Sequence, residues 1–446
     1  MEKRERLGSR LGFIFLSAGC AIGCGNVWKF PWMAGEYGGG GFVLIYLVCL
    51  LILGLPVMIM EFSLGRASQA SPVKMYQKLE KPGQKWHLHG YLALFGNICL
   101  MSFYTVVSGW ILYYFVQFLT GNSADLGFVP MITNPGVNMT YMLIVVVIGF
   151  LVLSFNLQGG LERVTKYMMG ALLVLMIVLA VNSATMEGAA EGLKFYLLPD
   201  LAKINANVIV GAMNQAFFTL SLGIGSMAIF GSYINKERTL MGESVNIIIL
   251  DSFVAITAGF IIFPACFTYD LEVGAGPSLL FDTMATVFNN MNNGRLWGSL
   301  FFLFMVFAAM STIFAVFENI LACVRELTGW SRPKGCIACG IGIAILATTT
   351  ALGYSLLPWQ PFAEGTAWLD FWDFIVSTNL LPLGSLMFAV FCCNKRYGWG
   401  WDKFIEEANT GEGLKVQQWM KPIFCYVVPV AIIVLYITGL MNFPWK

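Results

Sequence analysis

Charged side chains are scarce in this sequence. Asp, Glu, Lys and Arg together make up 11% of its 446 residues, and the formal net charge is only +1. Soluble domains carry about 25% of these residues, so the composition excludes an ordinary soluble protein. The near balance of charge also leaves no strong positive field to attract nucleic acid, and we expect no nucleic-acid partner.

Histidine is nearly absent as well. The chain has only His87 and His89, which we expect in one inner loop, while Cys336 and Cys339 form a CxxC pair in another. Neither pair has the second half-site that a zinc motif requires, so we favour simple packing or a solvated loop over metal binding. No Ser/His/Asp or Cys/His set can be placed at membrane depth, and we predict that the protein is not an enzyme.

Apolar residues, in contrast, are abundant, at 58% of the chain. A membrane-spanning helix needs about 20 mostly apolar residues. Eleven segments qualify, at roughly 10–36, 40–66, 89–120, 139–156, 164–184, 208–232, 240–268, 295–325, 335–353, 366–394 and 420–442. The charged N-terminus leads into the first segment without a small-residue cleavage site, so we expect it to stay on the mature protein. The sequence therefore predicts an all-α polytopic membrane protein with a single transmembrane domain, residues 1–442.

The distribution of lysine and arginine predicts the orientation. With the N-terminus inside, the predicted inner segments hold 21 of the 26 cationic residues and the outer segments hold four. The remaining one, Lys29, lies within the first span. Because inner loops of membrane proteins are enriched in Lys and Arg, we predict eleven spans with the N-terminus in and the C-terminus out.

The first span has an unusual centre. Residues 18–31 read AGCAIGCGNVWKFP, and the sixth span is interrupted in a similar way in NQAFFTLSLGIGSMAIF, at Gly223 and Gly225. Glycine in one span alone indicates close helix packing. Two interrupted spans at matching ranks favour an inverted repeat with a binding site between the breaks. We predict repeats at about 10–184 and 208–394, followed by an additional helix at about 420–442.

Five segments together resemble a known family. They read AIGCGNVWKFPWMAGEYGGGGFVLIYL in span one, PVMIMEFSLGR in span two, SFYTVVSGWILYY in span three, NQAFFTLSLGIGSM in span six and AAMSTIFAVFE in span eight. In order, spacing and topology they resemble the neurotransmitter:sodium symporter family, and in particular its bacterial leucine-transporter-like members. The resemblance implies the leucine-transporter fold, a 5+5 inverted repeat with broken helices 1 and 6. It also implies sodium-coupled import of hydrophobic amino acids by alternating access across a bacterial inner membrane.

The resemblance implies two sodium ions. The first site would be formed by Ala21, Asn26, Thr219 and Asp251. The second would use carbonyl oxygens of Gly19, Ile22 and Ala308 with the hydroxyls of Ser311 and Thr312. Ligand sets made only of oxygen suit a hard cation rather than a transition metal. Without the resemblance, the two hydroxyls could simply bond to carbonyls one turn back.

Asp251 stands where much of the family has asparagine. A carboxylate in an apolar span is a functional candidate by default, although it could also serve as a structural partner of another helix. Ala255, one turn on, occupies the position where chloride-independent relatives carry a carboxylate and chloride-dependent relatives a serine; Tyr46 and Gln215 match other chloride-site positions. We expect Asp251 to replace chloride as the compensating charge. Because burial disfavours a charged carboxylate, Asp251 should return protonated after sodium leaves, which predicts proton antiport.

The resemblance also implies the substrate. Amine transporters of the family carry an aspartate where this chain has Gly23, so the substrate here should bring its own carboxylate. The expected substrate contacts are Cys20, Ala21, Cys24, Gly25, Leu100, Tyr104, Phe218, Thr219, Ser221, Ile224, Thr312 and Val316. None is charged. Ile224 and Val316 are smaller than their counterparts in the leucine-selective pattern, so we expect large hydrophobic or aromatic side chains to fit.

Gates are implied at both ends. Lys29 and Asp373 match the outer charged pair, with Phe218 as a lid; Asp370, one turn earlier, is an alternative partner, and a snorkelling lysine is the alternative role of Lys29. The inner pair would be Arg4 and Glu326, supported by Tyr233.

Two further roles concern the broken helices and helix five. Glu61 is expected to bond to the unwound backbone of helices one and six. Gly159, Gly160 and Gly170 would let the inner end of helix five loosen and admit water to the second sodium site.

Two other functions share this fold. An ion channel needs a continuous polar path with fast release, whereas the expected path is closed by two charged pairs. An amino-acid sensor would need an output domain, and the loops are short.

Overall fold

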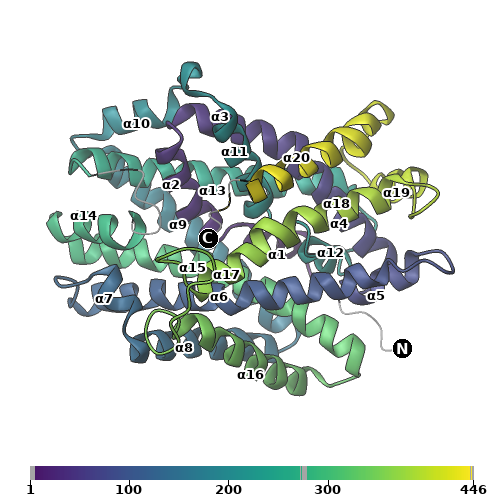
Figure 1. The fold of residues 1–446 in the computed structure, drawn as a ribbon, viewed down its shortest axis with the longest axis horizontal. Coiled ribbons are helices and arrows are strands. Elements are labelled where there is room, and N and C mark those ends of the chain that lie inside the picture. Colours follow the sequence, from purple (N-terminus) through teal and green to yellow (C-terminus); the bar gives the residue numbers. More distant parts are fainter. Residues whose placement is uncertain (1–5, 272, 274–278, 442, 444–446) are drawn as a thin grey trace.

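Helices account for all the regular structure in the part of the chain that can be described. A computed structural model describes residues 6–271, 273, 279–441 and 443, and Figure 1 shows their helices. The first half contains α1 (Arg10–Ala21), η1 (Gly25–Lys29), α2 (Phe30–Glu36), α3 (Gly40–Cys49), η2 (Leu50–Gly54), α4 (Leu55–Ser68), α5 (Pro72–Leu79), α6 (His87–Thr120), α7 (Phe128–Ile132), α8 (Pro135–Ser154), η3 (Leu157–Glu162), α9 (Arg163–Ala184), α10 (Ala189–Leu197) and η4 (Leu201–Lys203).

The second half begins with the other interrupted span. It contains α11 (Ala206–Thr219), α12 (Ser226–Gly231), α13 (Leu240–Thr268), η5 (Leu279–Thr283), α14 (Met284–Asn290), α15 (Gly294–Thr328), α16 (Arg332–Ala351), α17 (Trp368–Asp373), η6 (Phe374–Leu380), α18 (Leu381–Cys393), α19 (Trp401–Ala408), η7 (Gln418–Met420), η8 (Ile423–Val427) and α20 (Val428–Met441).

Most of the predicted spans are long enough to cross a bilayer. By length and composition, nine of the described helices qualify, and α1 with η1–α2 makes a tenth if this pair, bent by 52°, counts as one span. The predicted sixth span is divided between α11, with 14 residues, and α12, with six. Neither piece is long enough alone, so the described residues hold nine or ten candidate spans and the count of eleven stays a prediction.

The outward faces of the peripheral helices are apolar. In Figure 1, α8 and α16 lie side by side along one edge, while α20 lies on the opposite side. Exposed aliphatic residues on these helices and α9 include Val147, Leu151, Val174, Ile345 and Val430. Such surface would be costly in water and is the expected surface toward lipid.

The polar residues are concentrated at the centre instead. Asn26, Glu61, Gln215, Asp251 and Ser311 are all fully buried. They lie on the two interrupted spans and on α4, α13 and α15, which surround them. The fold therefore encloses its polar chemistry and leaves apolar faces outside.

Backbone geometry explains the second break. Ser221 has a φ of 51°, Gly223 of 96° and Gly225 of 71°, all in the left-handed region. A β-carbon on Gly223 would also collide with the Leu381 carbonyl. Glycine is therefore required there, while the left-handed serine costs about 1–3 kcal/mol that the surrounding structure must offset.

Glu61 stabilises this break between α11 and α12, as expected for the second broken span. Its Oε1 accepts from the Gly223 amide at 2.6 Å and its Oε2 from the Met227 amide at 3.1 Å. Asn97 of α6, which the sequence analysis did not single out, donates to the Ile224 carbonyl at 2.7 Å. Among the described residues, no Glu61 bond reaches the break of helix one, so that half of the expectation is wrong.

Candidate functional site

The two breaks lie against each other at the centre of the bundle. The Ser221 hydroxyl, from the second break, donates to the Cys20 carbonyl at 3.2 Å. Gln215 of α11 donates to the Gly25 carbonyl at 2.7 Å. Carbonyl and amide groups released by both breaks are therefore available to one site, as the glycine pattern predicts.

Two hydroxyls of α15 point at the end of α1. The Ser311 hydroxyl lies 3.1 Å from the Ile22 carbonyl and 2.8 Å from that of Ala308. The Thr312 hydroxyl lies 3.2 Å from the Gly19 carbonyl and 3.4 Å from that of Ile22. The five oxygens expected at the second sodium site are thus gathered in one place. Such a set, neutral and made of oxygen alone, fits a hard monovalent cation better than a transition metal.

A second cluster surrounds Asp251 on α13. Its Oδ1 accepts from Asn26 Nδ2 at 2.8 Å and from the Thr219 hydroxyl at 3.4 Å. Its Oδ2 accepts from the Tyr46 hydroxyl at 3.4 Å. Three of the four residues expected at the first sodium site therefore converge, and the fourth, Ala21, lines the adjacent cavity. The partners of Asp251 in this cluster are all neutral side chains, so a bound cation is electrostatically compatible with it.

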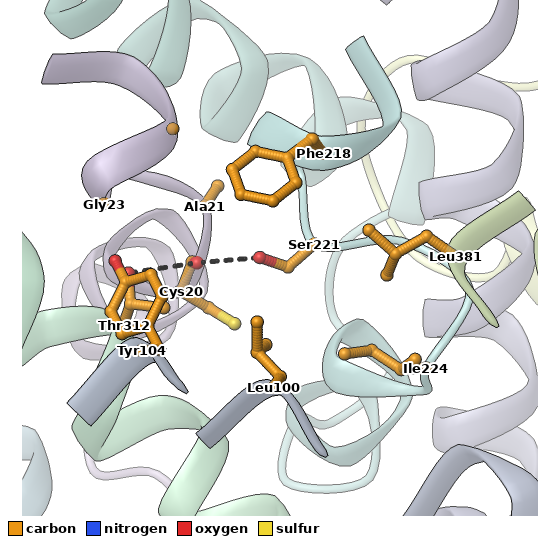
Figure 2. Close-up of a pocket in the computed structure, with 11 residues that line it drawn as sticks. Cys20, Ala21, Gly23, Leu100, Tyr104, Phe218, Ser221, Ile224, Thr312 and Leu381 are labelled. Carbon is orange, nitrogen blue, oxygen red and sulfur yellow. Dashed lines mark hydrogen bonds between the residues drawn. The ribbon is translucent and has the colours of Figure 1, made fainter. Parts of the chain in front are cut away.

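A cavity lies at the two breaks and is lined by residues of both (Figure 2). Its volume is only about 20 Å³, so the lining residues lie close together in this structure. Nine of the twelve expected substrate contacts line it, namely Cys20, Ala21, Gly25, Leu100, Tyr104, Phe218, Ser221, Ile224 and Thr312. Gly23 and Leu381 line it too, although Leu381 was not among the expected contacts.

Three expected contacts fall outside the lining. Val316 is fully buried elsewhere on α15, and Thr219 is directed to Asp251. Cys24 contributes its backbone: its amide donates to the Tyr104 hydroxyl at 2.9 Å. The rise along α15 explains Val316, because it follows Thr312 by one turn and so lies at a different depth.

Gly23 has no room for a side chain. A β-carbon there would collide with the hydroxyls of Thr312 and Tyr104. An aspartate at this position would therefore force both residues to move. The cavity is built without a fixed charge among its lining residues, and its polar groups are hydroxyls and backbone.

The outer charged residues are close to the cavity but not directly paired. The Lys29 ammonium lies 4.0 Å from the centroid of the Phe218 ring, the expected lid. Asp373 accepts from the Ser377 hydroxyl at 2.6 Å. Asp370 instead accepts from the Ala367 amide at 2.7 Å, at the start of α17. The structure therefore shows no direct Lys29–Asp373 ion pair among the described residues. Asp370 caps the start of α17.

The contacts described at the inner end involve Glu326, Tyr233 and Glu318, and they leave the expected Arg4–Glu326 pair a prediction. Arg4 lies outside the described residues, and Glu326 accepts from the Ser71 hydroxyl at 2.6 Å. Tyr233 donates to Glu318 at 2.7 Å, and the same carboxylate forms a buried ion pair with Arg332 at 2.5 Å. Glu318 was not among the expected gate residues. Its position in an apolar run of span eight is the feature of the sequence that could have indicated its role.

The fifth span, made of η3 and α9, contacts the segment before α1 through Glu162. Its carboxylate accepts from the Gly8 amide and from the Ser9 hydroxyl, each at 2.7 Å. Glu162 ends η3, a π-helical turn that contains Gly159 and Gly160, whereas Gly170 lies in the regular helix α9. Because π-helical turns are rare and often functional, η3 is compatible with the loosening expected of helix five.

Comparison with known proteins identifies the class. A model of the sodium:neurotransmitter symporter family matches residues 4–127 and 122–446, so the chain belongs to that family. It is 32% identical over 454 residues to the uncharacterised sodium-dependent transporter YhdH of Bacillus subtilis, covering 99% of each chain. An uncharacterised sodium-dependent transporter of Haemophilus influenzae is 30% identical over 463 residues, which cover 98% of this chain and 99% of the relative.

A solved structure provides the match in three dimensions. The crystal structure of MhsT in complex with L-phenylalanine superposes with a TM-score of 0.88 at 33% identity, covering 98% of this chain and 100% of that one. The protein is therefore an all-helical, multi-pass membrane protein with a leucine-transporter-like fold. It is a sodium-dependent transporter, with bacterial relatives, and not an enzyme.

Proposed function

We propose that the protein imports hydrophobic or aromatic L-α-amino acids together with sodium, by alternating access across a bacterial inner membrane. The observation that carries this proposal is the cavity between the two breaks, which has apolar walls, backbone and hydroxyl groups, and no charged side chain. A free amino acid supplies both of the charges that the cavity lacks. MhsT, whose structure contains L-phenylalanine, supports the same class of substrate.

The substrate carboxylate would bind near Gly25 and Tyr104. Backbone amides at the start of η1 favour an anion there, and the Tyr104 hydroxyl already contacts the Cys24 amide. The ammonium would be held by the Ser221 hydroxyl and by carbonyls of the two breaks. The crowding around Gly23 supports this arrangement, because it excludes an aspartate that could hold a decarboxylated amine.

Two sodium ions would accompany the substrate. One would lie beside Asn26, Thr219 and Asp251, and the other among the oxygens around Ser311 and Thr312. We propose that Asp251 supplies the compensating negative charge, so that transport needs no chloride, and that it carries a proton back after sodium release. A buried carboxylate beside a cation is favourable only while the cation is bound, which links sodium release to protonation.

Alternating access would use the repeats proposed at 10–184 and 208–394, with eleven spans, the N-terminus inside and the C-terminus outside. Lys29, Asp373 and Phe218 would close the outer side. On the inner side, Arg4 and Glu326 would form the gate, together with Tyr233.

The first experiment is uptake into liposomes. Reconstituted protein should accumulate tryptophan and leucine when sodium is higher outside, also when gluconate replaces chloride, and should not do so when choline replaces sodium. Accumulation above the outside concentration separates a transporter from a channel, and transport itself separates it from a sensor. Failure to accumulate any hydrophobic amino acid despite sodium would contradict the proposed substrate class.

A matched pair of variants tests the role of the α15 hydroxyls. Thr312→Val removes a hydroxyl that points at α1, and it should abolish sodium-driven uptake. Thr348→Val makes the same change on α16, where the hydroxyl donates only to the Ala344 carbonyl at 2.9 Å. That control should transport like the wild type.

A further inference from the structure

Leu381 is the cavity residue that comes from span ten. The other lining residues belong to the two interrupted spans, to α6 or to α15, whereas Leu381 begins α18. It is 4% exposed and therefore nearly enclosed. The resemblance to the family does not point to it, and nothing in the local sequence distinguishes it from other leucines.

Two glycines hold Leu381 in this place. A β-carbon on Gly223 would collide with the Leu381 carbonyl, and one on Gly384 would collide with the Gly223 carbonyl. The backbone of α18 therefore touches the backbone of the second break directly. Pro382 follows Leu381 and restricts the chain further at the start of the helix. Leu381 has little freedom to retreat from the cavity.

Leu381 also lies opposite the polar side of the cavity. Figure 2 shows Tyr104 and Thr312 on one side, Leu381 and Ile224 on the other, and Ser221 between them. A substrate whose charged groups lie against the hydroxyls would extend its side chain toward Leu381 and Ile224.

Ile224 is itself blocked from behind. A β-carbon on Gly96 of α6 would lie 2.8 Å from Ile224 Cγ2, so Ile224 already fills the space against α6. Its side chain cannot move away to admit a larger substrate without displacing that helix. Leu381 and Ile224 together thus form the rigid end of the cavity.

We propose that Leu381 determines which amino-acid side chains the transporter accepts, as the wall that limits their length. This inference rests on the proposed function, since it assumes that the cavity binds an amino acid. Shortening Leu381 should extend the cavity and favour tryptophan, whereas enlarging it should exclude tryptophan and favour shorter aliphatic substrates. In apolar pockets, a change of one or more methylene groups alters discrimination about 10- to 200-fold.

The test is competition for sodium-dependent binding by purified protein. The ratio of inhibition constants for tryptophan and leucine is measured for the wild type, Leu381→Ala, Leu381→Phe and Leu381→Met. We expect the ratio to shift at least about tenfold toward tryptophan in Leu381→Ala and in the opposite direction in Leu381→Phe. The volume-conserving Leu381→Met should stay near the wild type. Leu386→Ala is the control, because Leu386 is partly buried on the same helix and does not line the cavity.

Loss of folding and loss of selectivity are separable in this design. A variant that only weakens the protein lowers binding of both amino acids and leaves their ratio unchanged. An unchanged ratio in Leu381→Ala and Leu381→Phe, with sodium-dependent binding retained, would overturn the role of Leu381 and leave the proposed function intact. A wild-type protein that binds neither amino acid would overturn the proposed function and this inference with it.

Discussion

Replacing Asp251 with asparagine removes one negative charge from the centre of the protein and leaves the shape of the side chain nearly unchanged. The new amide oxygen can still accept the bond that Asn26 donates at 2.8 Å. The Tyr46 hydroxyl, at 3.4 Å, is the contact most affected, because the second carboxylate oxygen becomes an amide nitrogen. The substitution therefore tests mainly charge.

The magnitude follows from the electrostatic attraction to the Asp251 carboxylate that a sodium ion at this cluster would lose. At a separation of about 4 Å and an effective dielectric constant of about 20, the attraction between the ion and a carboxylate is about 4 kcal/mol. Since about 1.4 kcal/mol changes an equilibrium tenfold, complete loss would weaken sodium binding about a thousandfold. Water that enters the site would reduce this loss, so we expect the sodium concentration for half-maximal uptake to rise between about tenfold and a thousandfold.

Chloride should restore part of the lost affinity when a hydroxyl is added nearby. Ala255 is fully buried one turn from Asp251, and Tyr46 and Gln215 are buried as well. We expect uptake by Asp251→Asn with Ala255→Ser to require chloride, whereas the wild type is indifferent to it.

The assay is initial uptake by liposomes as a function of external sodium, in chloride and in gluconate. If, in gluconate, Asp251→Asn and the wild type need the same sodium concentration for half-maximal uptake, the compensating role of Asp251 is refuted.

Three further outcomes are expected. An acidic lumen should accelerate sodium-driven uptake by the wild type, because a protonated Asp251 returns without sodium, and should have no effect on Asp251→Asn; identical responses would contradict proton antiport. Gly23→Ala should weaken substrate binding about tenfold or more, because the added methyl group meets the Tyr104 hydroxyl and overpacking costs about 1–3 kcal/mol; equilibrium binding measures it. Arg332→Gln should destabilise the protein by about 3–5 kcal/mol, because it leaves the Glu318 carboxylate buried and unpaired, and the added change Glu318→Gln should recover part of the loss in thermal unfolding.

Sequence reasoning succeeded where local pattern and physical necessity coincide. Long apolar runs must become helices that satisfy their own backbone in lipid. A break such as the one at Gly223 must likewise be paired inside the protein, which pointed to a buried polar site and to Glu61 as its partner. Motif positions likewise predict Ser311 and Thr312 beside the end of α1, where their hydroxyls contact its carbonyls.

Contacts that depend on the relative position of distant helices were not accessible in the same way. Leu381 reaches the cavity because glycines on two segments let their backbones touch, and Val316 misses it by one helical turn. Glu162 meets Gly8 and Ser9 across about 150 residues of sequence. No pattern within either segment encodes such a meeting.

By itself, therefore, the sequence determined the class of protein, the interrupted spans and the chemistry gathered at them, since hydropathy, glycine and motif spacing are local properties of the chain. Only the tertiary structure decided which side chains enclose the cavity and which carboxylates and cations meet at the inner end. Those choices depend on helix rotation and on close approach between backbones, and each is the result of packing many segments at once.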